Sequence, residues 1–185
     1  MSELRADVPP SEEASHRSGW LWGGYARLGI VTLVPSLVID QAHKWWMLNV
    51  YDITARAPVE ITSFFDLVFV KNKGISYGML AQDGHGGQWA LAGFAVLTSI
   101  GLWIWLVRGA INPLIAVALG LIIGGALGNA IDRVVLGGVA DFFHFHVAGW
   151  SWYVFNIADV AIVAGVVGLL YDSLRPNRKD AAKPS

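Results

Sequence analysis

The 185-residue sequence contains no cysteine. The chain therefore forms no disulfide, offers no thiol nucleophile or thiolate metal ligand, and has no cysteine to which a lipid could be attached. Charge is scarce as well, since charged residues make up 15% of the sequence and the net charge is -1. Proteins that bind nucleic acid usually present a basic face, so this charge balance indicates no nucleic-acid partner.

Apolar residues are abundant instead. They make up 55% of the sequence, and the mean hydropathy is +0.50. Nine tryptophans are present, and most of them stand close together at the ends of apolar runs. Tryptophan gathers in this way at membrane–water interfaces, although tryptophans buried in a globular core are the alternative. The composition therefore favours a membrane protein, and the length suits one domain.

Four apolar segments predict membrane spans at about 24–47, 88–107, 110–132 and 155–174. The second and third reach the roughly 20 apolar residues that cross a bilayer, whereas the first and fourth depend on their flanks. Asn112 and Pro113 suit the N-cap and first turn of the third span. Residues 20–175 are expected to form one domain. Residues 1–19 and 176–185 are expected to be cytoplasmic tails, the first of them disordered.

Two long connections, 49–87 and 133–154, lie on the same side of this arrangement. A β-branched and aromatic run in the first, broken at Asn72-Lys73-Gly74, predicts a small hairpin or sheet. The predicted fold is thus mainly α: a polytopic membrane protein with a four-transmembrane-helix bundle and a small extracytoplasmic β-rich loop region.

Lysine and arginine set the predicted orientation, because cytoplasmic segments carry an excess of them. Eight fall on the side of the two termini and five on the side of the long connections. This bias predicts cytoplasmic termini. It places Asp40, Asp141 and Asp159 at the outer ends of spans.

Asp141 and Asp159 are the two acids that a membrane would penalise most. Asp159 could simply complete a capping box with Asn156, and Asp141 could pair with Arg133 or lie in a solvated loop. Acids next to hydrocarbon are costly and usually functional, however. Two carboxylates that lie close together share one proton, which is the state of an aspartic protease and requires no metal.

The sequence offers fewer candidate residues for other kinds of catalysis. His144 and His146 would share one face of a strand, so a metal pair is conceivable, but no H-E-x-x-H motif is present. Ser76 and Ser151 lack a triad context. The glycine-rich stretch "GLIIGGALGN" (120–129) lies inside a span and favours close helix packing over phosphate binding.

Four blocks in this order resemble one known family. They are "DQAHKWWM" (40–47), "VKNKGISYGML" (70–80), "GGALGNAIDRVVLGGVADFF" (124–143) and "FNIADVAIVAG" (155–165). Together they resemble the lipoprotein signal peptidase family, also called signal peptidase II, over roughly residues 28–172. Each block alone is weak, whereas the ordered set is specific.

This resemblance implies an aspartic endopeptidase of the bacterial inner membrane, with its active site toward the periplasm. It would remove the signal peptide of diacylglyceryl-modified prolipoproteins on the N-terminal side of the lipidated cysteine. Asp141 and Asp159 would be catalytic, and substrate-binding residues would be Asp40, Lys44, Asn72, Gly74, Asn129, Arg133 and Asn156. No cofactor or metal is implied. Partners would be lipidated substrates, membrane lipids and globomycin-type inhibitors, and the chain is expected to be a monomer.

The chain departs from the family at two positions. Lys73 adds a charge in the second block, and His144 stands where an acid is frequent. These departures bear on specificity rather than on chemistry. Two other functions stay open at this stage: a small transporter or proton channel, with acids along a path through the bilayer, and a structural subunit whose acids only cap helices.

Overall fold

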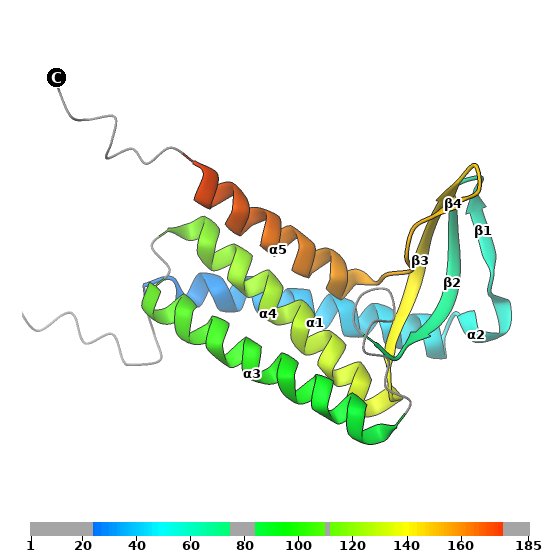
Figure 1. The fold of residues 1–185 in the computed structure, drawn as a ribbon, viewed down its shortest axis with the longest axis horizontal. Helices are drawn as coiled ribbons and strands as arrows, with labels where there is room; N and C mark the ends of the chain where they lie inside the picture. Colours follow the sequence, from blue (N-terminus) through cyan, green and yellow to red (C-terminus); the bar gives the residue numbers. More distant parts are fainter. Residues whose placement is uncertain (1–23, 75–83, 110–111, 176–185) are drawn as a thin grey trace, which may run out of the picture.

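The computed structural model describes residues 24–74, 84–109 and 112–175. Within these ranges, long helices form a bundle, and a small antiparallel sheet lies at one end of it (Figure 1). The long helices are α1 (Ala26–Asn49), α3 (His85–Gly109), α4 (Pro113–Leu136) and α5 (Ile157–Leu174). The predicted mainly helical architecture is confirmed. The predicted tails, 1–19 and 176–185, lie outside the described residues.

Three of the described helices, α3, α4 and α5, are long and apolar enough to cross a membrane. A helix rises about 1.5 Å per residue, so the 24 residues of α4 span more than the roughly 30 Å of hydrocarbon in a bilayer. Helix α1 is equally long but carries Asp40 and Lys44 in its C-terminal half. Large apolar side chains point outward from the bundle, among them Phe94 at 68% and Leu97 at 69% exposure. Lipid is the solvent that suits such a surface.

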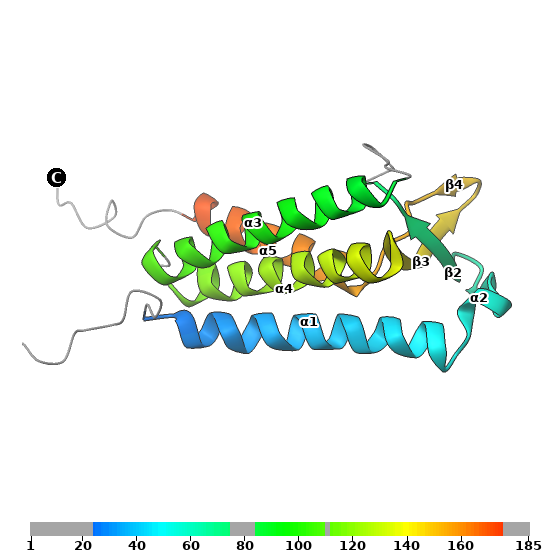
Figure 2. The same ribbon diagram turned by 90° about the horizontal axis from the view of Figure 1, so that it is seen from below.

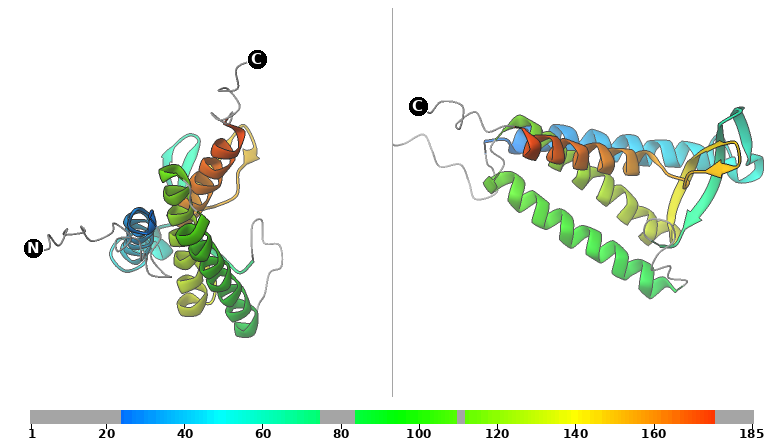
Figure 3. Two further views of the ribbon diagram at one scale, coloured as in Figure 1. Left: turned by 90° about the vertical axis from the view of Figure 1, so that its left-hand side faces the viewer. Right: turned by 45° about the horizontal axis from the view of Figure 1, so that its top comes forward.

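Helix α4 occupies the centre of the bundle and packs against α1, α3 and α5 (Figure 3). Its glycines make this possible. A Cβ on Gly124 would lie 2.7 Å from the Leu33 carbonyl oxygen of α1, and one on Gly125 would overlap the Ala158 carbonyl oxygen of α5. The glycine-rich stretch therefore serves close helix packing, as its position in a span predicted.

The sheet has the order β1-β2-β3-β4, and all neighbours are antiparallel. Its strands are β1 (Val59–Thr62), β2 (Phe65–Asn72), β3 (Val139–Val147) and β4 (Trp150–Ser151), and the short helix α2 (Ile53–Arg56) precedes β1. The sheet structure predicted for the first connection is present. Its hairpin turn lies at residues 63–64, however, and not at the predicted break, because Asn72 is the last residue of β2. The second connection, expected only as a loop, supplies two strands. The long strand β3 pairs with β2 across 67 or more residues of sequence, which no local pattern encodes, whereas β4 pairs locally with the end of β3.

Two local features attach the sheet to the bundle (Figure 2). Helix α4 ends at Gly137, whose φ of 70° lies in the left-handed region that favours glycine, and β3 begins two residues later. Farther along the chain, the backbone N–H groups of Phe142 and Phe143 both donate to the Phe155 carbonyl, at 3.0 and 2.9 Å. Phe155 directly precedes the N-cap of α5. The start of α5 is therefore held beside the middle of β3.

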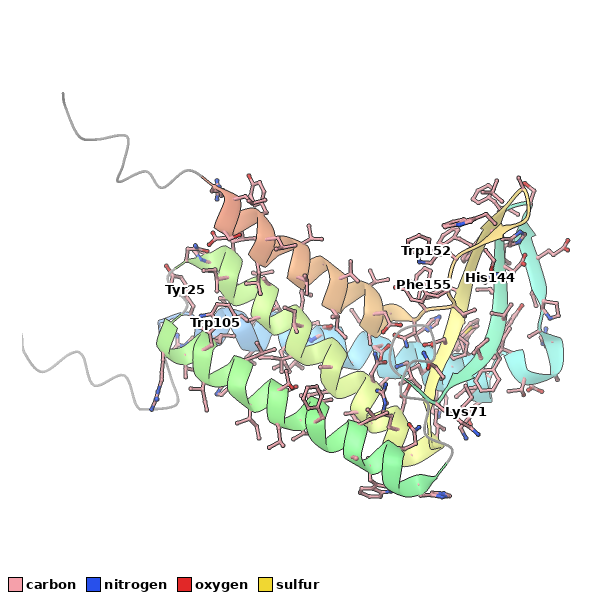
Figure 4. The ribbon with its side chains drawn as sticks, viewed as in Figure 1. Tyr25, Lys71, Trp105, His144, Trp152 and Phe155 are labelled. Atoms are coloured by element: carbon pink, nitrogen blue, oxygen red, sulfur yellow. The ribbon has the colours of Figure 1, made fainter. Side chains whose placement is uncertain are left out.

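Most of the described tryptophans are exposed, whereas Trp103 is half-buried and packs against the core of the bundle. Trp45 is 61% exposed, Trp89 58% and Trp150 55%. Figure 4 shows Trp105 near the end of the bundle remote from the sheet, and Trp152 beside the sheet. This placement at both ends agrees with interfacial belts and excludes the core alternative for these residues. Trp20 and Trp22 lie outside the described residues.

Candidate active site

Asp141 is a buried acid on the third strand. Its side chain is 2% exposed, which excludes the solvated-loop alternative. Its carboxylate accepts hydrogen bonds from Asn156 Nδ2 at 2.6 Å and from Asn72 Nδ2 at 3.2 Å. A buried carboxylate needs such donors, because no water replaces them.

Asp159 occupies the first turn of α5. Its backbone N–H donates to Asn156 Oδ1 at 3.0 Å, and its Oδ2 accepts from the Asn156 backbone N–H at 3.2 Å. This is the capping box that the sequence predicted. The other carboxylate oxygen, Oδ1, accepts from Asn129 Nδ2 at 2.9 Å. The capping box thus uses Oδ2, while Oδ1 is directed toward Asn129 on α4.

Asn156 joins the two acids. Its backbone N–H binds Asp159 while its side-chain amide binds Asp141 and, at 3.2 Å, Asn129 Oδ1. The bridge between Phe143 and Phe155 explains why a residue at the start of α5 can reach β3. Two acids separated by 17 intervening residues are therefore brought to one place by one asparagine.

Lys44 lies at the centre of a group of buried charged side chains next to these acids. Its ammonium group contacts Asp40 at 2.9 Å, Asp132 at 2.8 Å and Asn129 Oδ1 at 3.1 Å. All of these side chains are at most 9% exposed. In turn, Asp40 accepts from the Ala158 backbone N–H at 2.9 Å. The single positive charge of the lysine is shared by two carboxylates that would otherwise have no ion-pair partner among these contacts in a low-dielectric interior.

The same network extends to Asn72, at the end of β2. Arg133 donates to the backbone carbonyls of Asn129 and Gly74, both at 3.0 Å, and Gly74 donates its N–H to Asn72 Oδ1 at 3.0 Å. The Arg133 Nε is buried and finds no hydrogen-bond partner among the described residues. All nine residues named from the sequence thus belong to one connected hydrogen-bonding network.

Sequence reasoning missed two members of this network. Asp132 was not named as a site residue from the sequence, yet it pairs with Lys44 and accepts from the Ala140 backbone N–H at 3.1 Å. Gln41 donates to Asp40 at 3.2 Å and to Asp132 at 3.0 Å. Both residues stand in the quoted blocks, so the spacing of Gln41 and Lys44 on one helix face was the available signal.

The environment of Asp141 changes its acidity. Burial, and after it the negative charge of Asp159, raise the pKa of Asp141 from 3.8 to about 7. The hydrogen bonds from Asn156 and Asn72 act against this shift, because they stabilise the ionised form. At neutral pH the Asp141 carboxyl group can therefore hold a proton and donate it.

The other candidate residues lie elsewhere. His144 and His146 share a face of β3 beside Asp66, outside this network. Ser151 Oγ lies 2.7 Å from His144 Nε2, and Asp66 Oδ2 lies 3.8 Å from Nδ1 of the same ring, which is too far for the hydrogen bond of a catalytic triad. Ser76 lies outside the described residues.

Fold and site together describe a multi-pass membrane protein whose buried carboxyl groups meet where a helical bundle joins a small sheet. The sequence profile of signal peptidase (SPase) II matches residues 32–175. A bacterial membrane enzyme structure, determined by the in meso method at 2.3 Å resolution, aligns with a TM-score of 0.69 at 27% identity, and the alignment covers 85% of this chain and 91% of that one.

Two curated relatives carry the name lipoprotein signal peptidase. The protein of Methylobacterium radiotolerans is 50% identical over 160 residues, which cover 86% of this chain and 93% of the relative. The protein of Methylorubrum extorquens is 52% identical over 150 residues, covering 81% and 87%. The chain therefore belongs to the signal peptidase II family and is an aspartic peptidase of the membrane.

Proposed function

We propose that this chain removes signal peptides from diacylglyceryl-modified prolipoproteins, cutting on the N-terminal side of the lipidated cysteine. Asp141 and Asp159 activate water for this reaction. The observation that carries the proposal is that Asn156 joins two acids, the buried Asp141 and the half-buried Asp159. The name of the two relatives, lipoprotein signal peptidase, supports lipoprotein precursors as the class of substrate.

The environments of the two acids suggest separate roles. Asp159 lies in the first turn of α5, where the helix dipole favours a carboxylate, while Asp141 has the raised pKa of a group that keeps its proton. Asp159 therefore takes a proton from water, and the resulting hydroxide attacks the scissile carbonyl carbon. Asp141 gives its proton to the carbonyl oxygen, which forms a neutral gem-diol. When the gem-diol collapses, the C–N bond breaks, the proton held by Asp159 passes to the leaving nitrogen, and a gem-diol hydroxyl returns its proton to Asp141.

Neighbouring polar groups hold the substrate and the acids in place. Arg133 is fixed through two backbone carbonyls, and its unpartnered Nε offers a donor for a carbonyl of the bound peptide. Asn72, Asn129 and Asn156 fix the carboxylates from three different elements. Asp40 and Lys44 support the acids indirectly. Asp40 accepts from the Ala158 backbone N–H, and Lys44 donates to Asn129 Oδ1.

An apolar groove of about 350 Å³ suits the lipid part of such a substrate. It lies between α1, α3 and α4 and is lined only by aliphatic side chains: Leu37, Ala92, Val96, Leu127, Ala130, Ile131, Val134 and Val135. Several of these residues flank Asn129 and Arg133 on α4. An acyl chain beside the scissile bond could occupy it without leaving an apolar environment.

The proposed location follows from the same features. The chain would reside in the bacterial inner membrane with both termini in the cytoplasm, so that the sheet and the acids face the periplasm. Water reaches this site from outside, and lipid reaches it from the bilayer. The protein acts as a monomer, without a cofactor in the reaction, and globomycin-type peptides would compete for the site.

Cleavage by the purified full-length protein in lipid or detergent tests this function. A preprotein carrying diacylglycerol on its lipobox cysteine should be cut directly before that cysteine, and the matched unmodified preprotein should be cut far more slowly. Mass spectrometry of the products locates the cut. Equal turnover of both substrates, or a cut elsewhere, would refute the proposed specificity.

A further inference from the structure

The outward sheet carries a second cluster of polar side chains, formed by Asp66, His144 and His146. Asp66 on β2 lies opposite His144 on β3. His146 is two residues farther along β3 and shares the face of His144, because side chains alternate along a strand. One donor atom of each residue lies within 4.8 Å of the other two. Figure 4 shows His144 on the sheet.

The hydrogen bonds around His144 indicate which ring nitrogen carries the proton when the ring is neutral. Nε2 lies 2.7 Å from Ser151 Oγ, and this hydroxyl donates its single proton to the Trp152 carbonyl at 3.2 Å. Ser151 must therefore accept from Nε2–H, so that Nδ1 of the neutral ring carries a lone pair. This Nδ1 lies 3.8 Å from Asp66 Oδ2. A lone pair thus faces a carboxylate, an arrangement that a cation between them would stabilise.

His146 approaches the same oxygen. Its Nε2 lies 2.8 Å from Asp66 Oδ2, but the ring is not directed along a hydrogen bond, and neither Nε2 nor Asp66 Oδ1 has a hydrogen-bond partner among the described residues. The distance alone suggests an ion pair, whereas the direction of the ring does not. A hydrogen bond weakens steeply off its axis, so this short contact is not a strong hydrogen bond.

We propose that Asp66, His144 and His146 bind a Zn²⁺ ion, with water as the fourth ligand. Two tetrahedral ligands about 2.0–2.2 Å from zinc lie roughly 3.3 Å apart, between the 2.8 and 3.8 Å separations found here. Imidazole together with carboxylate favours zinc over calcium or magnesium. Ser151 acts as the outer partner that orients a metal-bound histidine.

The position of the site fits reversible loading from outside. The side chains of Asp66, His144 and His146 are 15%, 22% and 34% exposed, so an ion can reach them and retain a water molecule. The ion would join β2 to β3, the two strands that also carry Asn72 and Asp141. Asp141 is three residues from His144 and faces the opposite side of β3. The site is therefore separate from the acid pair and does not depend on the proposed peptidase reaction.

Zinc titration of the full-length protein tests this inference, after metal is stripped with a chelator and any affinity tag is removed. Competition with a chromophoric zinc chelator should give one tightly bound Zn²⁺ per chain. His144→Asn, His146→Asn and Asp66→Asn should each weaken binding by more than tenfold. His85→Asn, which changes an exposed histidine outside the cluster, should bind like the unaltered protein, and so should Asp141→Asn.

Three outcomes would overturn the inference. They are no bound zinc, unchanged affinity in the cluster variants, and equal loss in His85→Asn or Asp141→Asn. Thermal unfolding checks that the variants fold. If they do not, zinc-edge X-ray absorption of the unaltered protein decides: two histidine nitrogens in the first shell are expected, and a shell without them contradicts the site.

Discussion

At the scale of single residues, the site depends on buried polar groups that are hydrogen-bonded to one another, with the Arg133 Nε as the exception among the described atoms of the network. Asn156 is 0% exposed and serves both acids, and Lys44 is 3% exposed and serves Asp40 and Asp132. Removing one partner from such a network leaves a buried group unpaired, at a cost of about 1–3 kcal/mol or more for a charge. Each of these residues is therefore a sensitive position.

The raised pKa of Asp141 leads to a prediction about pH. If Asp141 must hold a proton, kcat/KM should fall as the pH rises through about 7, where this carboxyl group ionises. Asn72→Leu removes a hydrogen bond that stabilises the ionised form, so the alkaline limb should move to higher pH. A pH profile of both proteins makes the comparison. A limb that moves to lower pH, or stays in place, would argue against Asp141 as the acid.

At the scale of elements, α4 holds the site together because its glycines let α1 and α5 approach. Gly125 lies against the Ala158 carbonyl, and Ala158 directly precedes Asp159. Gly128 lies against the Asp40 carboxylate, where an added Cβ would be 2.5 Å from Oδ2. The close packing of these helices therefore also determines where the acids lie.

Gly125→Ala should destabilise the protein and reduce its activity together. The added methyl group overlaps a backbone carbonyl, and overpacking of this kind costs about 1–3 kcal/mol. Gly101→Ala is the matched control, because an added Cβ on this exposed residue of α3 meets no described atom within 4 Å. Thermal unfolding and turnover should be unchanged or slightly improved there. An equal response of the two variants would contradict the packing role of Gly125.

The elements also show what the sequence could predict. Long apolar runs, the Asn112 N-cap and the capping box of Asn156 are local patterns, and the structure confirms all of them. The third strand of the sheet was not predicted, because its partner lies far away in the chain. Asp132 was missed for a similar reason: its partner Lys44 is on another helix.

At the scale of the whole molecule, the buried acids gather at one end. The buried Asp40, Asp132 and Asp141 and the half-buried Asp159 lie where the bundle meets the sheet. Helix α3 carries no acid, and Asp172 lies at the opposite end of α5, where it accepts from Asn112. A transporter would need acids along a path through the bilayer, so this distribution does not favour that alternative. It favours chemistry at a membrane surface.

Orientation can be tested on the intact molecule in a bacterial membrane. The excess of lysine and arginine near the termini predicts that a reporter fused to the C-terminus lies in the cytoplasm. A green fluorescent reporter should fluoresce there, and an alkaline phosphatase fusion should be inactive. Fusions within the 49–57 segment should give the reverse pattern. Active phosphatase at the C-terminus would require the opposite orientation.

The central claim is that Asp141 and Asp159 act together on one water molecule. Its most direct test is single-turnover cleavage of a lipidated preprotein by purified Asp141→Asn and Asp159→Asn, with Asp52→Asn, an exposed aspartate near α2, as the control. Each dyad variant should lose about 10²- to 10⁴-fold in rate while its thermal unfolding shows a folded protein, and the control should keep full activity. Substantial turnover by either folded dyad variant would contradict the account.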